Sequence, residues 1–396
     1  MNIGVVFSDT QTSIGGGLSY QIKLAKIIKK ISGINIYYFS SDKDTINELK
    51  SQNIKAIYFN LNYFDKLIFR LKRLRFFSNL SNFIDTRLDK KFEKYDIELV
   101  YFLSPNSHSI YLENLSYIFT VWDLCHRDHP EFPEVRKHFS FENREKLFNQ
   151  VLPKASKIIA ESSLGKQNLV QRYNVDSDKC VILNMPVSHF DEDELNVTED
   201  FIKNTKKKFN ISNQFIFYPA QIWAHKNHVY VLDALKILIK KNQKIDFVFC
   251  GKDKGNLDNI LSYAKKNSLE NQIKYLNFID KKELVALYKS SLALVMPSYF
   301  GPTNIPPLEA FRLSTSVIYP IHDTEEILFN NSIFEIKLDE PKTLVENIEK
   351  ILKKDPIIEI KKQNGLKYLS NHNDELLRNN LNQIFHDFEK KMKTWK

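Results

Sequence analysis

Short apolar runs rich in β-branched residues alternate with amphipathic segments along nearly the whole chain. Between the first two runs, for example, Leu18, Ile22, Ala25 and Ile28 recur at the spacing of a helix. The apolar runs of the first half predict strands over 2–8, 34–40, 54–59, 97–102, 117–122, 157–161 and 180–184. Such alternation is typical of βαβ units, so we expect an α/β fold with parallel sheets.

A polar stretch over 191–212 interrupts this pattern, and it begins with four consecutive acidic residues. The pattern then resumes, with strands predicted over 215–218, 247–251, 272–277, 292–296 and 315–319. We therefore predict two tandem, doubly wound Rossmann-like domains. The predicted parts are an N-terminal domain 1–190, a linker 191–212, a C-terminal domain 213–370, and a C-terminal helix 371–396 that could pack back on the N-terminal domain.

The composition is that of an ordinary folded protein, since 43% of the 396 residues are hydrophobic and 27% are charged. This excludes wholesale disorder and fibrous repeats. No apolar run approaches the length of a membrane span, and the first residues lack the pattern of a secretion signal. Cys125, Cys180 and Cys250 lie far apart without metal-ligand spacing, as in a reducing compartment. We expect a cytoplasmic protein.

The net charge of +9 has a local contribution between Lys66 and Lys94, where nine basic residues stand against three acidic ones. Phenylalanine, leucine and isoleucine side chains are interleaved with these cations over 63–94. Such a segment could lie on an anionic membrane surface, which would place the protein on the inner face of the cytoplasmic membrane. It could equally be an ordinary amphipathic helix with a solvated basic face. No motif supports nucleic-acid binding.

Three consecutive glycines, Gly15, Gly16 and Gly17, lie between the first predicted strand and the first helix of a chain with only ten glycines. A bare backbone at a helix N-terminus lets an anionic ligand approach main-chain N–H groups. The run is neither a Walker loop nor a dinucleotide fingerprint. The alternative is a plain flexible turn.

A second loop of this kind follows the strand predicted over 292–296 and leads into a helix. Thr303 and Asn304 offer side-chain and backbone donors, and Pro306 and Pro307 suit a first helical turn. Glu309 would lie on that turn and face the same crevice.

This loop resembles the signature of retaining glycosyltransferases of the family 4 type, which have the GT-B fold. The usual Glu-Gly-Phe-Gly-Leu-Pro here reads Gly-Pro-Thr-Asn-Ile-Pro over 301–306. The segments 218–228 (YPAQIWAHKNH) and 249–252 (FCGK), and the triple glycine, also resemble parts of that family, so the resemblance covers most of the chain. It implies two domains facing an interdomain cleft. It also implies transfer of a hexosyl or related group, with retention, from a nucleotide-sugar to a glycan or lipid-linked acceptor, as in capsule, O-antigen or lipopolysaccharide biosynthesis.

The resemblance also implies roles for individual residues. Glu309 would accept hydrogen bonds from the donor ribose, and Lys226 would neutralise the diphosphate. A fixed cation is most useful where a leaving diphosphate develops negative charge, which supports the second role independently. The backbone of Thr303, Asn304 and Ile305 would meet the phosphate or the sugar. The remaining donor-binding candidates are Gly15, Gly16, Gly17, Gln221 and Gly251.

Two positions depart from the family pattern. The first glutamate of its E-x7-E pattern falls on Gly301, and an arginine that commonly precedes the lysine falls on Gln221. These departures leave room for altered donor choice, slower chemistry, or a binding-only protein. The alternatives are thus a non-catalytic nucleotide-sugar or nucleic-acid binding protein, and a nucleotide-sugar epimerase of the same fold.

In the first domain, the loop 120–134 concentrates acidic, basic and aromatic residues after an apolar strand. We interpret Asp123, His126 and Arg127 as sugar or acceptor contacts, and with Lys226 they complete the candidate catalytic set. The alternative is a capped loop whose charges pair with one another.

No metal or other cofactor is expected. His225 and His228 have no carboxylate or cysteine beside them at ligand spacing, and the DxD-like triplets do not close a buried strand. No pair of carboxylates can be assigned as nucleophile and acid, so we name no general base. In the front-face path that the resemblance implies, the departing phosphate takes the acceptor proton.

Overall fold

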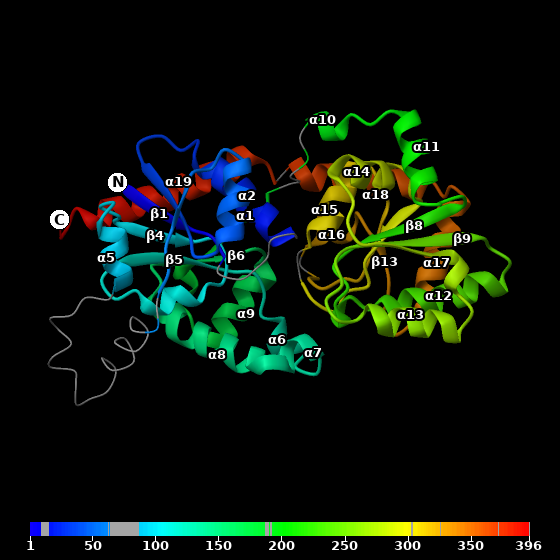
Figure 1. Ribbon diagram of the computed structural model, residues 1–396, viewed down its shortest axis with the longest axis horizontal. Helices are drawn as coiled ribbons and strands as arrows, with labels where there is room; N and C mark the ends of the chain where they lie inside the picture. Colours follow the sequence, from blue (N-terminus) through cyan, green and yellow to red (C-terminus); the bar gives the residue numbers. More distant parts are fainter. Residues whose placement is uncertain are drawn as a thin grey trace. The chain divides into compact units, whose positions relative to one another are not determined.

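The computed structural model describes residues 1–8, 16–61, 63, 87–186, 190, 192–301, 304–324, 326–370 and 372–395 (Figure 1). The chain divides into two compact units. The N-terminal unit consists of Met1–Leu124, Phe141–Pro186 and Asp374–Lys396, and the C-terminal unit consists of Cys125–Ser140 and Val187–Asn373. Each unit contains one parallel sheet, which confirms the predicted pair of Rossmann-like domains.

The N-terminal sheet has the strand order β3-β2-β1-β4-β5-β6-β7, and all of its pairs are parallel. Its strands are β1 Asn2–Val6, β2 Asn35–Ser40, β3 Ala56–Tyr58, β4 Leu99–Phe102, β5 Ser116–Val121, β6 Lys157–Ala160 and β7 Cys180–Ile182. Its longer helices are α1 Gly16–Ile28, α2 Lys43–Ser51, α5 Arg87–Glu93, α8 Ser140–Val151, α9 Ser163–Tyr173 and α19 Asp374–Met392. Each strand lies within one of the runs from which it was predicted, to within a residue.

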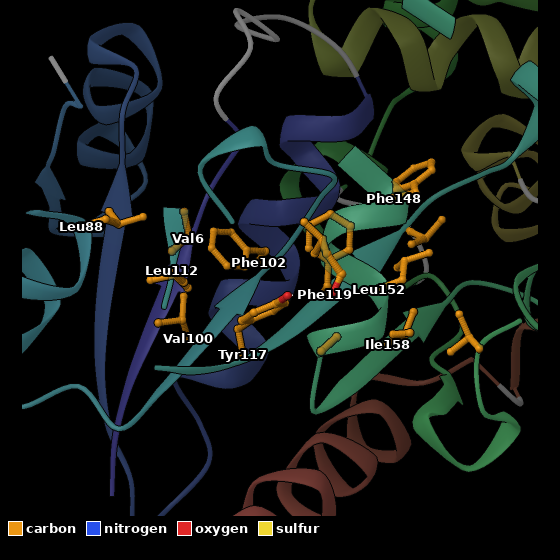
Figure 2. Packing of buried hydrophobic residues seen from close by; sticks show 14 of the residues in the cluster. Val6, Leu88, Val100, Phe102, Leu112, Tyr117, Phe119, Phe148, Leu152 and Ile158 are labelled. Atoms are coloured by element: carbon orange, nitrogen blue, oxygen red, sulfur yellow. Dashed lines mark hydrogen bonds between the residues drawn. The ribbon is translucent and has the colours of Figure 1, made fainter. Parts of the chain in front are cut away.

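Buried aliphatic and aromatic side chains pack together in the core of this unit (Figure 2). All four residues of β4 are buried, as expected for a parallel strand that is covered on both faces. Phe119 of β5 lies 6.1 Å from Phe102 and 6.4 Å from Phe148 of α8, measured between ring centroids. These ring contacts pack α8 against β5, beside β4.

The last helix, α19, also belongs to the N-terminal unit. Its first residue, Asp374, lies 2.5 Å from the ammonium of Lys23 in α1. Phe385 packs edge-on against Tyr101 of β4 at 6.3 Å.

The C-terminal sheet has the order β10-β9-β8-β11-β12-β13 and is also parallel. Its strands are β8 Gln214–Pro219, β9 Ile245–Cys250, β10 Ile273–Leu276, β11 Ala293–Val295, β12 Val317–Tyr319 and β13 Phe334–Glu335. Its helices include α12 His228–Lys240, α13 Leu257–Lys266, α14 Lys281–Ser290, α15 Ile305–Arg312, α16 Ile327–Asn330, α17 Pro341–Leu352 and α18 Ile357–Ser370. The two-residue strand β13 was not predicted, because so short a run carries no periodicity.

The structure differs from the sequence prediction in two segments. The stretch 191–212, predicted as a linker, contains the helices α10 Glu192–Leu195 and α11 Glu199–Lys208. Thr198 caps α11 by accepting from the N–H of Phe201, so a polar composition here marks a solvated helix and not a loop. The segment Cys125–Ser140, predicted within the first domain, groups with the C-terminal unit. It contains the short helices α6 Cys125–Asp128 and α7 Pro133–Arg136.

The strand order of the C-terminal sheet reverses between β8 and β11. In doubly wound sheets, ligands bind outside the carboxyl ends of the strands at such a switch point. The loops that follow β8 and β11 are therefore the first place to look for a site.

Candidate functional site

Lys226 connects the two loops at the switch point. It ends a 3-10 turn, Ala224–Lys226, that follows β8. Its Nζ lies 3.1 Å from Oδ1 of Asn304 and 3.3 Å from Oγ of Ser298, both in the loop after β11. These two acceptors are neutral, so the contacts orient the ammonium without cancelling its charge. The structure thus brings together Lys226 and Asn304, which the sequence analysis singled out separately.

Two hydrogen bonds hold carbonyl groups of the turn Ala224–Lys226 in place. The Tyr218 hydroxyl donates to the carbonyl of Lys226 at 2.6 Å, and the N–H of Tyr299 donates to the carbonyl of His225 at 2.9 Å. Asn227 then adopts the left-handed conformation, at φ 55°, which asparagine tolerates better than most residues. The chain can therefore turn sharply from the loop into α12.

The side chain of Asn304 organises the loop after β11. Its Nδ2 donates to the carbonyls of Phe300 and Gly301 at 3.2 Å and 3.0 Å, and it lies 2.5 Å from the Tyr319 hydroxyl. That hydroxyl donates in turn to the carbonyl of Gly301 at 3.1 Å. Burial raises the pKa of Tyr319, so this phenol keeps its proton at neutral pH. Asn304 thus holds the loop through its Nδ2 and accepts from the ammonium of Lys226 through its Oδ1.

Gly301 has a backbone that explains its departure from the family pattern. Its φ is 92°, a conformation that residues with a Cβ rarely adopt. A glutamate at this position would strain the loop as it stands here. The backbone of this loop therefore favours glycine at the position where the family pattern has its first glutamate.

The start of α15 offers few main-chain donors. Ile305 is its first residue, and the two prolines that follow, Pro306 and Pro307, have no N–H groups. In the first helical turn only Ile305 can therefore present an N–H to an anion beyond the helix end. Thr303 lies outside the described residues.

Glu309 is buried in α15, with 4% of its surface exposed. Its Oε2 accepts a hydrogen bond from the Tyr288 hydroxyl of α14 at 2.7 Å. Burial, together with the nearby charge of Glu309, raises the pKa of Tyr288 far above its usual value. The phenol is therefore a permanent donor, and it holds the carboxylate in one orientation.

Gln221 and Gly251 lie at the ends of the neighbouring strands β8 and β9. The Oε1 of Gln221 accepts from the indole N–H of Trp223 at 3.1 Å. The N–H of Gly251 donates to Leu276, and its carbonyl accepts from Tyr275 at 3.0 Å. A Cβ on Gly251 would lie only 2.3 Å from the carbonyl oxygen of Ala220. Gly251 thus permits a close approach of two loops, while its own N–H is used within the sheet.

The two histidines of this region have different surroundings. Oε1 of Glu134 contacts the Nδ1 of His225. The imidazole of His228 is fully buried and stacks on Tyr218 at 4.5 Å, and neither of its nitrogens has a partner among the described residues. Burial, with the nearby charges of Lys226 and His225, lowers the pKa of His228 to about 3. In the described part of the chain, no three His, Cys, Asp or Glu side chains come together as metal ligands.

In the N-terminal unit, Gly16 and Gly17 begin α1, whereas Gly15 lies outside the described residues. A Cβ on Gly17 would lie 3.0 Å from the ring of Trp122, which follows β5. The Trp122 ring also meets Tyr20 edge-on at 6.2 Å. The absence of a side chain at Gly17 therefore lets the indole pack against the start of α1.

The three candidates of the loop after β5 are divided between the units. Asp123 belongs to the N-terminal unit, where Arg144 of α8 donates to its carboxylate at 2.8 Å and to its carbonyl at 2.7 Å. His126 and Arg127 belong to the C-terminal unit, and they lie in α6 with His126 fully buried. The charges of this loop that form ion pairs thus have partners in other segments as well as within the loop.

The sequence analysis missed four residues of this region: Ser298, Tyr319, Tyr288 and Glu134. Ser298 and Tyr319 lie at or just after the carboxyl ends of β11 and β12, so the same strand-end rule could have found them. Nothing local in the sequence connects Tyr288 to Glu309, or Glu134 to His225.

Most of the segment 63–94, proposed as a membrane-surface element, lies outside the described residues, which include only residue 63 and 87–94. Asp89 of α5 is buried and accepts from the backbone N–H groups of Glu113 and Asn114. No helix in the described part of the chain is long and apolar enough to cross a membrane.

Comparison with known proteins places this geometry in a family context. Residues 200–383 match the family described as Glycosyl transferases group 1. The O-antigen chain mannosyltransferase RfbU of Salmonella typhimurium is 25% identical over 242 residues, which are 59% of this chain and 60% of that protein.

Solved glycosyltransferases share the fold over almost the whole chain. A glycosyltransferase from Rickettsia africae superposes with a TM-score of 0.73 at 19% identity, and the match covers 98% of both chains. HepE of Anabaena, solved in complex with UDP-glucose, superposes with a TM-score of 0.74 at 14% identity over 98% of this chain and 100% of that one. These neighbours confirm the expected GT-B fold.

Proposed function

We propose that the chain transfers a sugar from a nucleotide-sugar donor to a glycan or lipid-linked acceptor in surface polysaccharide biosynthesis. The proposal starts from the match of residues 200–383 to the group 1 glycosyltransferases. The observation that carries the proposal is the placement of Lys226 at the switch point of the C-terminal sheet, against Ser298 and Asn304. A cation held there can stabilise the charge that develops on a departing diphosphate.

The other groups around Lys226 fit the same role. Ile305 offers an N–H at the start of α15, and Glu309 presents a carboxylate whose orientation Tyr288 fixes. A carboxylate suits the vicinal hydroxyls of a ribose, because each hydroxyl can donate to one of its oxygens. Transfer needs no metal ion in this proposal, since Lys226 supplies the positive charge at the phosphate. Retention is proposed from the resemblance of the loop 301–306 to retaining glycosyltransferases.

The acceptor and the donor are proposed from the relatives. An O-antigen mannosyltransferase supports a growing surface glycan as acceptor. The donor is less defined, since one relative is a mannosyltransferase and a structural neighbour was solved with UDP-glucose. Gln221 and Gly301 leave room for a donor that differs from both.

A thermal-shift screen over UDP-, GDP-, ADP- and CMP-sugars tests the proposal. A donor at 100 times its dissociation constant should add about 2.7 kcal/mol of stability. The stabilising donor is then incubated with the protein, with and without EDTA, and the anomeric configuration of the product is read by NMR. A stabilising donor that is never turned over would favour a binding-only protein. Activity that EDTA abolishes and Mg²⁺ restores would contradict the metal-free mechanism.

A further inference from the structure

An acidic residue outside the predicted site lies directly beside the turn that carries Lys226. Oε1 of Glu134, in α7, accepts from the backbone N–H of His225 at 3.0 Å and also contacts the Nδ1 of that histidine. The Glu134 and His225 side chains are only 12% and 11% exposed. All of these atoms belong to the C-terminal unit. The contact is therefore a charge-assisted hydrogen bond in a largely desolvated setting, where such bonds are strong.

The electrostatics show that the carboxylate is committed to this contact. Burial by itself raises the pKa of Glu134, but the hydrogen bonds from the ring and the backbone of His225, its own backbone N–H and the charge of His225 together outweigh it. The pKa of Glu134 therefore lies below its ordinary value. The group is ionised at neutral pH and accepts both bonds.

Aromatic packing adds a second constraint on His225. Its ring stacks on Phe300 with centroids 4.2 Å apart and planes 10° apart. Phe132, two residues before Glu134, meets the ring of His225 edge-on at 6.3 Å and that of Phe300 at 5.3 Å. The segment Cys125–Ser140 and the loop after β11 thus hold His225 from two sides.

Glu134 contacts the backbone of the turn at an N–H group and not at a carbonyl. Tyr218 and Tyr299 bind the carbonyls of Lys226 and His225, whereas Glu134 binds the N–H immediately before Lys226. Without that bond, the N–H side of His225 would lose its hydrogen bond, and the turn would be held less firmly by its carbonyl contacts, its own backbone bonds and the stack on Phe300. The Nζ of Lys226 would then lose its fixed position against Asn304.

We infer that Glu134 is a positioning residue, which acts through His225 to hold Lys226 where the leaving diphosphate develops its charge. The inference rests on the role of Lys226 in the proposed function. It assigns to the segment after β5 a part in the donor chemistry, through a contact with the turn before α12 and not through a sugar contact.

The test is a double-mutant cycle on donor turnover. Glu134→Ala should lower kcat by about tenfold in the otherwise wild-type protein and by less than about twofold in a Lys226→Ala background, because residues that act through one another are not additive. The KM for the donor should change less than kcat, since the cation acts mainly as the diphosphate departs. Glu134→Gln should restore part of the rate, because the amide oxygen can still accept from the N–H of His225.

Glu131 provides the matched control. It lies in the same segment, is 64% exposed, and contacts His129 at 3.4 Å. Glu131→Ala removes the same charge, and both kcat and KM should stay at wild-type values. If Glu134→Ala does not fold, Glu134→Asp, whose shorter side chain withdraws the carboxylate, replaces it in the cycle.

The outcomes separate this inference from the proposed function. Fully additive effects of the two alanine variants, or an unchanged kcat in folded Glu134→Ala, would overturn the positioning role alone. A Lys226→Ala variant with wild-type kcat would overturn the proposed role of Lys226, and the role of Glu134 with it.

Discussion

At the scale of single residues, the region around the switch point consists of polar side chains that fix one another. Tyr288 holds Glu309, and Asn304 holds both Lys226 and its own loop. The bonds of Tyr288 to Glu309 and of Lys226 to Asn304 join residues from different elements. A substitution at any one of them therefore changes the geometry of its partner as well as its own chemistry.

Glu309 gives the most direct test of the donor site. Glu309→Ala should lower kcat/KM for the donor by roughly tenfold or more, because a charge-assisted hydrogen bond contributes about 1.5–3 kcal/mol. Tyr288→Phe is the control, since it removes only the orienting bond and should have a smaller effect. Both variants are compared by steady-state kinetics and melting temperature. Wild-type kinetics in folded Glu309→Ala would remove this carboxylate from the site.

His228 predicts a specific dependence of stability on pH. Its pKa is about 3 in the folded protein and near 6.5 when exposed, so the unfolded chain binds a proton first as the pH falls. Stability should therefore be full above pH 6.5 and decline toward pH 3, with a slope of up to about 1.4 kcal/mol per pH unit from this group. Urea unfolding at a series of pH values measures it.

His228→Phe should flatten that decline, because phenylalanine can keep the stack on Tyr218 and has no titrating group. His386→Phe, at an exposed position of α19, should leave the decline as it is in the wild type. Equal pH profiles for His228→Phe and the wild type would show that another group is responsible.

At the scale of elements, close approaches between strand-end loops decide the shape of the region. The loops after β8 and β9 pair at Ile222 and Asp253, and Gly251 permits the contact. We expect Gly251→Ala to destabilise the protein by about 2 kcal/mol or more, from both the positive φ and the clash with Ala220. Thermal and urea denaturation would measure the loss.

Gly255 separates the two causes. Its φ is also positive, at 94°, but a Cβ there would have no atom within 4 Å. Gly255→Ala should therefore cost only about 1–2 kcal/mol, which is the strain alone. Losses of equal size in the two variants would mean that the approach to Ala220 contributes nothing.

At the scale of the whole molecule, two parallel sheets that share the order of their first six strands belong to units with different candidate residues. The C-terminal unit contains Lys226, Asn304 and Glu309, and the N-terminal unit contains Gly16 and Gly17 at the start of α1 and the pair of Asp123 with Arg144. The proposed donor residues lie in the C-terminal unit, whereas the predicted membrane-surface segment 63–94 lies in the first half of the sequence, so the two predicted functions should be separable by substitution.

The basic segment provides that separation. Changing Arg70, Lys72, Arg73 and Arg75 together to Glu replaces four attractions to anionic lipid, each worth about 1 kcal/mol near the surface, by repulsions. Co-sedimentation with anionic liposomes should collapse, whereas donor hydrolysis in solution should persist.

A charge-reversal control uses three exposed lysines at the end of the chain, Lys390, Lys391 and Lys393. Their change to Glu should leave liposome binding much closer to that of the wild type. A wild-type protein that ignores anionic liposomes at low salt would show that the segment 63–94 is only a solvated helix.

The sequence by itself determined the α/β class and the positions of most strands. Apolar runs and helical spacing are local properties, and parallel βαβ units place every strand's carboxyl end at one edge. For the same reason it pointed to Asn304, which lies in a loop after a strand. Lys226 was singled out by the resemblance of the segment 218–228 to a known family, before any contact between the two residues was known. The sequence did not show β13, because two residues carry no period.

Only the tertiary structure decided which distant side chains meet. Glu134 and His225 are 91 residues apart, and Asp123 and Arg144 are 21 apart. The sequence contains several basic residues that could pair with each carboxylate, and long-range packing decided which one does. The same packing, through Phe132 and Phe300, grouped the segment Cys125–Ser140 with the C-terminal unit. Such choices depend on which surfaces are buried together, and this is a property of the whole fold that no local pattern records.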